Sequence, residues 1–530
     1  MLTRRELLGT TAAAAASAAL PGGASAQVPK DTAVIAMAMA DAISLDPGEC
    51  FEFSGSEVCN NIYERLLRPN AADPSKLDGV LAKSWDVKDG KSFTFTLNGT
   101  SKFSSGKPVT AEDAVFSLQR AVILNKSPGP ILTQFGLNKD NVEKAIRATG
   151  PNTLVVELPE AVAPSFFLNC LSANVGGVVE KAVAMANAKD GDLGNAWLKL
   201  NSAGSGPYML RTWRASDTFV LEANPHAPVQ PKTRRIIIRH MPEPGPQALG
   251  LEKGDIDIAR GLPAEVVERL SKDSQYSVQK VPRASQLVLA LSQPFAPWQK
   301  VEVRRAVKLA IDYDGIQKNI LKDMYMVHQM HQPVGFPGAV TDKPYSRKVD
   351  EARALLKQAG FEQGIEVEFD YSNAFPFPDI AQAIQANLAD VGIKLKMMPA
   401  EGRQALTKLR NRNSQLYMGR WAGDYFDPHT NSDWFLHNPD NSADSKTRKF
   451  AWRVSWDTGE FTKRVTEATK EQDTAKRLKM YEQLQRDDAN VSPIVYLFQE
   501  VQLVVSRANV KGLDLGLIYD STRYDNITKG

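Results

Sequence analysis

Two carboxylates stand among aromatic side chains between Tyr417 and His429, where the sequence reads Y-M-G-R-W-A-G-D-Y-F-D-P-H. They are Asp424 and Asp427, and glycine and proline residues interrupt the run around them. Aromatic faces exclude water, and glycines let a backbone approach a ligand closely. A carboxylate in such dry surroundings can hold a cationic group strongly, so the segment is a candidate ligand pocket. The alternative is a strand end with an Asp-Pro turn and with Trp421 in the core.

The elements around this segment predict how it is held. A short apolar strand is predicted at 416–418, directly ahead of the two carboxylates. From about residue 297 to about residue 492, helical and strand patterns alternate, which indicates an α/β lobe. Ligands of open α/β sheets tend to meet the loops that leave the carboxyl ends of strands, so this placement favours the pocket. Within the lobe we expect a helix, a strand, a second helix and a second strand, at 350–361, 367–371, 380–391 and 393–397.

The first 26 residues have the features of an export signal. Arg4 and Arg5 form a twin arginine, an alanine-rich run follows from Gly9 to Leu20, and A-S-A at 24–26 is a cleavage site. The apolar run is shorter than the ~20 residues that span a bilayer, and no cysteine follows it as a lipidation site. We therefore expect a Tat-type signal peptide at residues 1–26 and a soluble periplasmic product.

Length and charge restrict the class of protein. Removing 26 residues from 530 leaves 504, too many for one hydrophobic core, which predicts two or more domains. The full chain carries a formal charge of +3 and the signal +1, so the mature chain carries +2. Such an even balance argues against a nucleic-acid partner, which would favour a clustered basic face. No later stretch approaches the ~18 uninterrupted apolar residues of a membrane span, so contact with a membrane is expected to go through partner proteins.

The three cysteines, Cys50, Cys59 and Cys170, leave one question open. In an oxidising compartment Cys50 and Cys59 could close a small loop and leave Cys170 unpaired. All three could equally be free and buried, and their spacing in the sequence does not decide between the two arrangements.

Local patterns in the first half predict further elements. Apolar residues at helical spacing favour a helix over 58–67. Thr110, with Asp113 three residues later, is typical of a helix start. The run G-S-G-P-Y at 204–208 predicts a tight turn in which the glycines adopt positive φ and the proline fixes the exit.

Several of these blocks resemble one protein family. Four of them follow one another in the order and approximate spacing of the N-terminal signature of the family 5 extracellular solute-binding proteins, the periplasmic receptors of ABC importers for peptides, nickel and related solutes. They are N-I-Y-E-R-L-L at 61–67, L-A-K-S-W at 81–85, F-T-F-T-L at 93–97 and K-F-S-S-G-K-P-V-T-A-E-D-A-V-F-S-L-Q-R at 102–120. The resemblance extends to G-S-G-P-Y, similar to the family's G-T-G-P-Y, and to V-R-R-A-V-K-L-A-I-D at 303–312.

The resemblance implies an architecture for the whole chain. It implies an α/β fold of the two-lobe periplasmic binding protein kind, type II and of the large class with an extra subdomain, hinged by two crossings. Lobe 1 would span 27–294 with a subdomain inserted at about 70–199, lobe 2 would span 295–499, and 500–530 would return to lobe 1. The crossings are expected near residues 295 and 500.

The resemblance also implies a function. The protein would be a periplasmic receptor, expected to be monomeric, that closes its lobes on a ligand and docks on an inner-membrane ABC permease driven by separate ATPase subunits. Short peptides are the preferred ligand. An opine, a sugar derivative or a nickel or other metal chelate is the alternative, and a secreted hydrolase is a third possibility. No cofactor is expected.

Site residues follow from the same segment. Asp424 occupies the position where the family's peptide receptors carry an aspartate that pairs with the ligand's α-amino group. Trp421 and Tyr425 are candidate pocket walls, and Gly423 would let a ligand approach the backbone. Arg420 could hold a ligand carboxylate, the alternative being a solvated arginine at a strand end.

Other chemistry has weaker support in the sequence. His328 and His331, in M-V-H-Q-M-H-Q, could bring two imidazoles and a methionine to one metal ion, but no third ligand stands at a fixed spacing. The chain contains no G-x-S-x-G, H-E-x-x-H, G-x-x-x-x-G-K-[ST], G-x-G-x-x-G or C-x-x-C motif. We therefore assign no metal ligand and no catalytic residue, and expect a binding protein rather than an enzyme.

Overall fold

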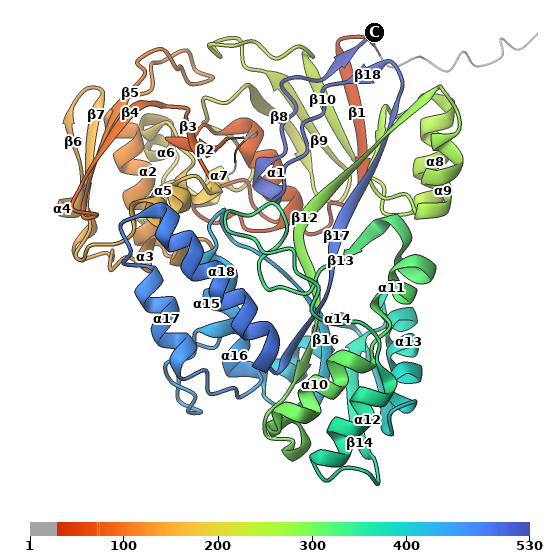
Figure 1. Ribbon diagram of the computed structural model, residues 1–530. Coiled ribbons are helices and arrows are strands. Elements are labelled where there is room, and N and C mark those ends of the chain that lie inside the picture. Colours follow the sequence, from red (N-terminus) through yellow and green to blue (C-terminus); the bar gives the residue numbers. More distant parts are fainter. Residues whose placement is uncertain (1–28, 71–72, 74) are drawn as a thin grey trace, which may run out of the picture.

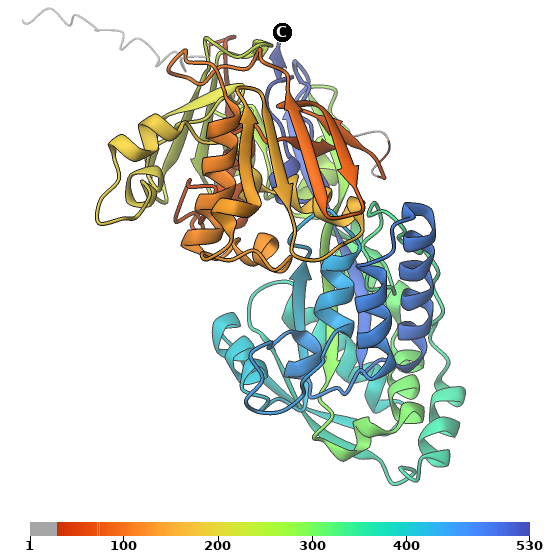
Figure 2. The same cartoon turned by 90° about the vertical axis from the view of Figure 1, so that its left-hand side faces the viewer.

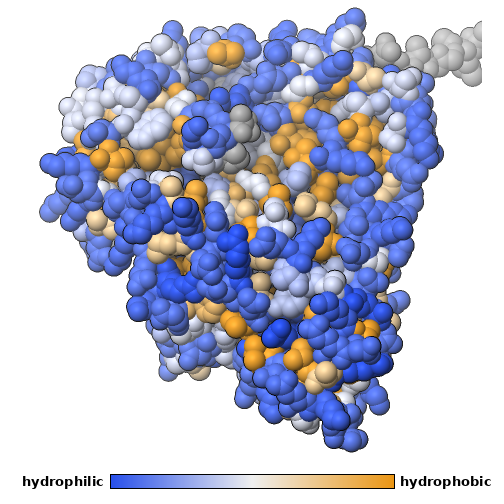
Figure 3. Space-filling view, viewed as in Figure 1, coloured by the Kyte–Doolittle hydropathy of each residue, from blue (hydrophilic) through white to orange (hydrophobic). Residues whose placement is uncertain are grey.

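The computed structural model describes residues 29–70, 73 and 75–530. The predicted signal peptide, residues 1–26, lies outside the described residues. Within the described ranges, no helix is both long enough and apolar enough to cross a membrane. The molecule has an upper and a lower lobe in Figure 1, and polar side chains cover most of the face in Figure 3, with apolar ones gathered in the middle of the upper lobe.

One sheet of eleven strands runs through both lobes. Its outer strands belong to one lobe each, and the two long central strands, β12 and β17, are shared. The order is β15 (Ile393–Ala400), β14 (Ile365–Ser372), β16 (Leu416–Ala422), β12 (Tyr276–Leu291), β17 (Ile494–Arg507), β11 (Ile258–Ala259), β1 (Thr32–Met37), β10 (Arg235–His240), β9 (Thr218–Ala223) and β8 (Tyr208–Arg214), with β13 (Tyr325–Val327) paired to β17.

The strands β12 and β17 carry the chain between the lobes (Figure 1). They pair antiparallel, and their register breaks between Pro282 and Gln286. After the break, Leu287 and Leu289 already belong to the core of lobe 2, so the first crossing precedes residue 295, where the composition of the sequence changes. The return crossing falls near Gln499, where β17 passes the same break.

Lobe 2 has helices on both faces of its part of the sheet. Side chains of β12 alternate between the faces, as a period of two requires: Leu287 and Leu289 pack on one side, and Val288 and Ala290 on the other. The first face is covered by α10 (Val301–Ala310), α12 (Val349–Gln358) and α13 (Phe377–Ala389). The second is covered by α14 (Gly402–Arg410), α15 (His429–Leu436), α17 (Glu460–Ala468) and α18 (Thr474–Val491).

Lobe 1 carries a second sheet beside the main one. Its strands lie in the order β4 (Ala82–Lys88), β5 (Ser92–Leu97), β7 (Thr153–Glu157) and β6 (Ile146–Gly150), and they share a core with α2 (Ala111–Leu124) and α5 (Pro164–Leu171). The predicted start of α2 is present, because Thr110 accepts a hydrogen bond from the Asp113 N–H and the Asp113 carboxylate accepts one from the Thr110 N–H. Figure 2 shows this sheet and α2 in front of the upper lobe. We call this part the α2 subdomain.

Two local predictions are wrong for one shared reason. The helix expected over 58–67 is α1 (Phe53–Ile62), which ends at Ile62. Neither Gly204 nor Gly206 has a positive φ. A Cβ at Gly204 would lie 2.2 Å from the Ile62 carbonyl oxygen, and that oxygen accepts a hydrogen bond of 2.8 Å from the Gly206 N–H. The glycines therefore permit close approach to the end of α1, and this contact replaces the next helical turn.

All three cysteines are free thiols and buried in this structure. Cys50 and Cys59 belong to the core of lobe 1, and Cys170 belongs to the core of the α2 subdomain. Cys50 and Cys59 therefore form no disulfide in this structure.

Candidate functional site

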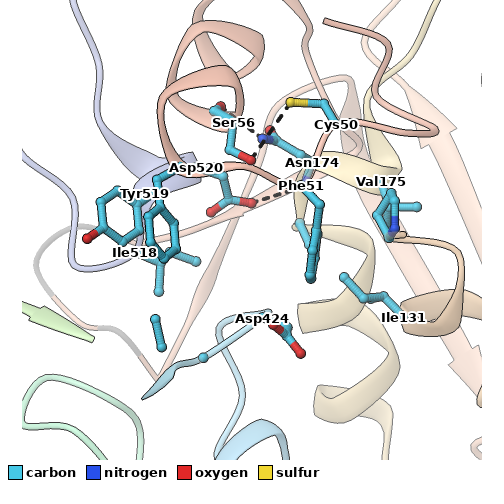
Figure 4. A pocket seen from close by; sticks show the side chains of 15 residues that line it. Cys50, Phe51, Ser56, Ile131, Asn174, Val175, Asp424, Ile518, Tyr519 and Asp520 are labelled. Atoms are coloured by element: carbon cyan, nitrogen blue, oxygen red, sulfur yellow. Dashed lines mark hydrogen bonds between the residues drawn. The ribbon is translucent and has the colours of Figure 1, made fainter. Parts of the chain in front are cut away.

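Asp424 lies two residues after the end of strand β16, on the side of lobe 2 that faces lobe 1. The side chain borders a cavity between the lobes whose empty space, with the open solvent at its mouth included, is about 530 Å³. Figure 4 shows Asp424 on one wall of this cavity and Asp520 on the opposite wall. Lobe 2 supplies Ala422, Gly423 and Asp424, and lobe 1 supplies Cys50, Phe51, Phe53, Ser56, Pro128, Ile131, Ala173, Asn174, Val175, Ile518, Tyr519 and Asp520.

The Asp424 carboxylate has no hydrogen-bond or ion-pair partner among the described residues, whereas its main-chain N–H donates to the Thr430 hydroxyl at 3.0 Å. Burial, together with the nearby carboxylate of Asp433, raises the pKa of Asp424 to about 7. Asp433 itself stays ionised because the Lys449 ammonium lies 2.5 Å and His437 Nδ1 lies 3.0 Å from its Oδ1. Asp424 is therefore a hydrogen-bond acceptor without a partner among the described residues. A cation bound beside it would favour its ionised form.

The other predicted site residues divide into two groups. Gly423 lines the cavity with Asp424. Trp421 instead stacks on Trp434 inside lobe 2, with ring centroids 3.9 Å apart, and Tyr425 is buried in the core of the α2 subdomain. Neither ring is part of the cavity wall, so as pocket walls both predictions differ from the structure. The aromatic residues that line the cavity are instead Phe51, Phe53 and Tyr519 of lobe 1.

Arg420 lines a second, more open hollow between the lobes, of about 1630 Å³. Its Nη1 lies 3.6 Å from Oε2 of Glu500, and its guanidinium lies 5.8 Å from the centre of the Phe53 ring. Arg420 lies within β16, whereas Asp424 lies beyond its end, and the two side chains line different hollows.

Asp427, the second carboxylate of the segment, has a structural role. It forms a two-pronged ion pair with Arg477 of α18, with N–O distances of 2.6 and 2.8 Å, and both side chains are fully buried. The side chain of Asn169, on α5 of the α2 subdomain, donates to the same carboxylate at 3.0 Å. Although burial opposes ionisation, the Arg477 guanidinium holds the pKa of Asp427 below its usual value. Asp427 thus joins the α2 subdomain to lobe 2 away from the hinge.

Replacing Asn169 with alanine is expected to weaken ligand binding about two- to tenfold although Asn169 does not line the cavity. The Asn169–Asp427 hydrogen bond joins the two sides of the cleft, and a hydrogen bond of this kind contributes about 0.5–1.5 kcal/mol. Calorimetric titration of the variant with a ligand of the wild-type protein measures the effect. An Asn138→Ala variant, at an exposed position of the same subdomain, serves as the control, and equal affinities of the two variants would contradict the link.

The histidine pair gives no support to the metal alternative. His331 Nδ1 lies 3.1 Å from Asp488 Oδ2, and its Nε2 lies 2.9 Å from the Ser432 hydroxyl, so both ring nitrogens are engaged within the protein. His328 Nε2 lies 2.5 Å from the Gln332 carbonyl oxygen. In the part of the chain that the structure describes, no group of three histidine, cysteine or acidic side chains is arranged to hold a metal ion.

Sequence reasoning did not find the lobe 1 half of the site. Phe51 and Phe53 stand in F-E-F at the start of α1, whose first residue is Phe53, and each is 38 % exposed. The F-E-F run is visible in the sequence, but the exposure that marks these rings as a binding surface is visible only in the structure. Asp520 stands in the C-terminal return to lobe 1, in a segment without any recognisable motif, and only the folded chain brings it opposite Asp424.

Two lobes joined by two strands, with a cavity between them and an acceptor without a partner at a strand end, define the class of hinged solute-binding proteins. Residues 76–443 match the family described as "Bacterial extracellular solute-binding proteins, family 5 Middle", and the chain belongs to this family. The predicted family and the predicted two-lobe α/β fold are confirmed. The protein is a solute-binding receptor.

Characterised relatives and solved structures resemble nearly the whole chain. The "Probable D,D-dipeptide-binding periplasmic protein DdpA" of Escherichia coli is 28 % identical over 92 % of each chain. The periplasmic oligopeptide-binding protein OppA of Salmonella typhimurium is 26 % identical over 93 % of this chain and 92 % of its own. The periplasmic binding protein DppA of Helicobacter pylori, solved with the peptide STSA, superposes with a TM-score of 0.76 at 23 % identity, covering 94 % of this chain and 98 % of its own. HbpA2 of Haemophilus parasuis gives a TM-score of 0.79 at 22 % identity, covering 94 % and 100 %.

Proposed function

We propose that the protein captures short peptides in the periplasm and delivers them to an inner-membrane ABC permease with separate ATPase subunits. The observation that carries the proposal is the Asp424 carboxylate, which lies between the lobes and has no partner in the part of the chain that the structure describes. A peptide's α-ammonium group is a cation with three N–H donors, suited to such an acceptor. The relatives named for dipeptide and oligopeptide binding support a peptide over other solutes.

The geometry supplies a way to bind an extended peptide. The α-ammonium group would bind Asp424, the chain would run along the end of β16 beyond Met418, where β14 no longer pairs with it, and a terminal carboxylate would reach Arg420 in a peptide of suitable length. Phe51, Phe53 and Tyr519 would contact the ligand from lobe 1. Because the ligand touches both lobes only when they are closed, its binding shifts the population toward the closed form, which the permease would recognise.

The proposed export route is the twin-arginine pathway. It rests on Arg4 and Arg5 ahead of the alanine-rich run and the A-S-A site. Changing both arginines to lysine is expected to leave an unprocessed precursor in the cytoplasm, measured by fractionation and immunoblotting. Continued export of that variant would favour the general secretory route instead.

The central experiment is mass spectrometry of the small molecules that co-purify with the natively exported protein and are released by denaturation. The Asp424→Ala variant, purified in parallel, is the control. Short peptides on the wild-type protein that are lost from the variant would support the proposal. A non-peptide solute such as an opine, or peptides retained unchanged by the variant, would contradict the peptide function or the role of Asp424, respectively.

Affinity for a peptide with a free N-terminus is expected to be greatest between about pH 7 and pH 8. Below the pKa of about 7, Asp424 gains a proton and loses the charge that holds the ammonium group, so affinity falls by up to about tenfold for each pH unit. Above about pH 8 the α-ammonium group itself deprotonates. Titration calorimetry from pH 5.5 to pH 9 measures the profile.

An N-acetylated peptide is the matched control for this profile. It lacks the ammonium group, so its weaker binding should not show the loss above pH 8. A flat profile for the free peptide would show that Asp424 does not hold the ammonium group.

A further inference from the structure

The cavity beside Asp424 contains acidic side chains and no basic one. Among the described residues that line it, the charged side chains are Asp424 from lobe 2 and Asp520 from lobe 1. Figure 4 shows these two carboxylates on opposite walls, with Phe51 and Ile131 to one side of the space and Ile518 and Tyr519 to the other. The charges of this cavity therefore select for positive groups in whatever it binds.

Asp520 keeps one carboxylate oxygen without a partner. The residue is 8 % exposed and lies in the short 3₁₀ turn Tyr519–Ser521. Its Oδ2 accepts a hydrogen bond of 2.9 Å from the Asn174 N–H and lies 3.5 Å from Nη1 of Arg65. Its Oδ1 is buried and has no hydrogen-bond partner among the described residues. Burial raises the pKa of Asp520, although Arg65 acts in the opposite direction.

Arg65 does not complete the pairing of Asp520. It lies outside the lining of the Asp424 cavity, and its guanidinium donates to several acceptors within lobe 1. These include the main-chain oxygen of Asp520 at 2.6 Å and the side-chain oxygens of Asn60 and Asn174 at 2.7 Å each. The free oxygen of Asp520 is left for a donor that arrives with the ligand.

A carboxylate in a mostly apolar enclosure costs free energy unless donors or positive groups satisfy it. Among the described residues Asp424 has no cation beside it, and Arg65 lies near only one oxygen of Asp520. A single ammonium group paired with Asp424 leaves Asp520 with an unsatisfied oxygen. We infer that Asp520 is a second anchor, and that this receptor takes ligands with two cationic groups at one end, such as peptides whose first residue is basic. That the ligand is a peptide rests on the proposed function. That it has two cationic groups rests only on the side chains that line the cavity.

The walls between the two carboxylates fit the carbon chain of such a ligand. Phe51, Ile131 and Val175 supply apolar contacts between the two acidic groups. A lysine side chain has an apolar stem and a charged end, so its stem would pack on these residues while its ammonium group binds Asp520. Because Asp520 and Asp424 belong to different lobes, a ligand with two cations would also hold the lobes closed.

The test compares ligands that differ in one group. Wild-type protein is titrated calorimetrically with lysyl-alanyl-alanine, with norleucyl-alanyl-alanine, which keeps the four-carbon chain without the amine, and with glutamyl-alanyl-alanine. We expect the lysyl peptide to bind at least tenfold more tightly than the norleucyl peptide, and the glutamyl peptide to bind most weakly. In Asp520→Asn the preference for lysyl over norleucyl should fall below about threefold. Equal affinity of the two peptides for wild-type protein would overturn the inference.

A second measurement separates this inference from the peptide function. Melting temperatures are recorded with 1,4-diaminobutane and with butylamine, which differ by one ammonium group and contain no peptide bond. Stabilisation by the diamine only, without binding of any peptide, would remove the peptide function and leave the two-cation site. Peptide binding with no preference for the lysyl peptide and no difference between the two amines would leave the peptide function and remove the two-cation site. If Asp520→Asn does not fold, the wild-type comparisons decide the question by themselves.

Discussion

Peptide affinity is expected to fall by roughly 10- to 150-fold when Asp424 is replaced with asparagine, because a charge-assisted hydrogen bond at a partly dry site contributes about 1.5–3 kcal/mol. Asparagine keeps the size of the side chain and its main-chain contact to Thr430 but removes the charge. Titration calorimetry at pH 7.5 with one tripeptide measures the loss.

The matched control is Asp314→Asn, at an exposed carboxylate of lobe 2 that lies outside the cavity. This variant should bind as the wild-type protein does, which separates the local effect of Asp424 from a change in net charge. An Asp424→Asn protein with the affinity of the control would show that the ligand's cation, if it has one, binds elsewhere.

The same substitution is expected to stabilise the empty protein. A carboxyl whose folded pKa is raised to about 7 binds more protons in the folded than in the unfolded state between about pH 4 and pH 7, so folding stability declines across that range and stays lower above it. Asparagine does not titrate and avoids this loss. At pH 8 the melting temperature of Asp424→Asn should exceed that of wild type by roughly 1–2 °C, and at pH 4 the two should agree.

The largest effect on stability is expected from Asp427→Asn. The substitution leaves the Arg477 guanidinium buried without its counter-charge, and removing one partner of a buried ion pair costs about 3–5 kcal/mol. Denaturant unfolding followed by tryptophan fluorescence measures the loss. The variant also keeps only one side-chain acceptor oxygen, for which Arg477 and Asn169 would compete, so the link between lobe 2 and the α2 subdomain should weaken.

Another ion pair of α18 provides the control for this experiment. Arg464 and Asp487 lie 2.7 Å apart, and their side chains are 28 % and 37 % exposed. Asp487→Asn should therefore cost about 0–1 kcal/mol. Similar losses in the two variants would mean that the burial of the Asp427–Arg477 pair has no consequence for stability.

The parts of the fold that were predictable are those set by short-range patterns. The helix expected over 350–361 is α12, with Gly360 at a φ of 81° just after it, as a left-handed helix end requires. The strands expected at 367–371 and 393–397 lie within β14 and β15, and the stretch ahead of Asp424 is β16. In these places local spacing and tertiary packing favour the same structure.

The parts that were not predictable depend on contacts between distant segments. The end of α1 is decided by Gly204 and Gly206, more than 140 residues later, because a main-chain contact has no signature in the helix itself. Asp520 became a site residue only through the return of the chain to lobe 1. Trp421 looked like a pocket wall because aromatic residues near a carboxylate suit a pocket, yet its ring packs on Trp434 within lobe 2.

The gap in the ladder between β12 and β17 has a mechanical consequence. Paired segments on either side of Pro282–Gln286 resist bending because their hydrogen bonds would have to stretch, whereas the residues within the gap are outside that ladder. The break is therefore the place where the two strands can bend most easily. A small rotation there moves the far rim of the cleft through a large distance. A rotation there would leave the pairing of β12 with β16 intact, so a ligand that pulls on Asp424 would move that part of lobe 2 as one unit.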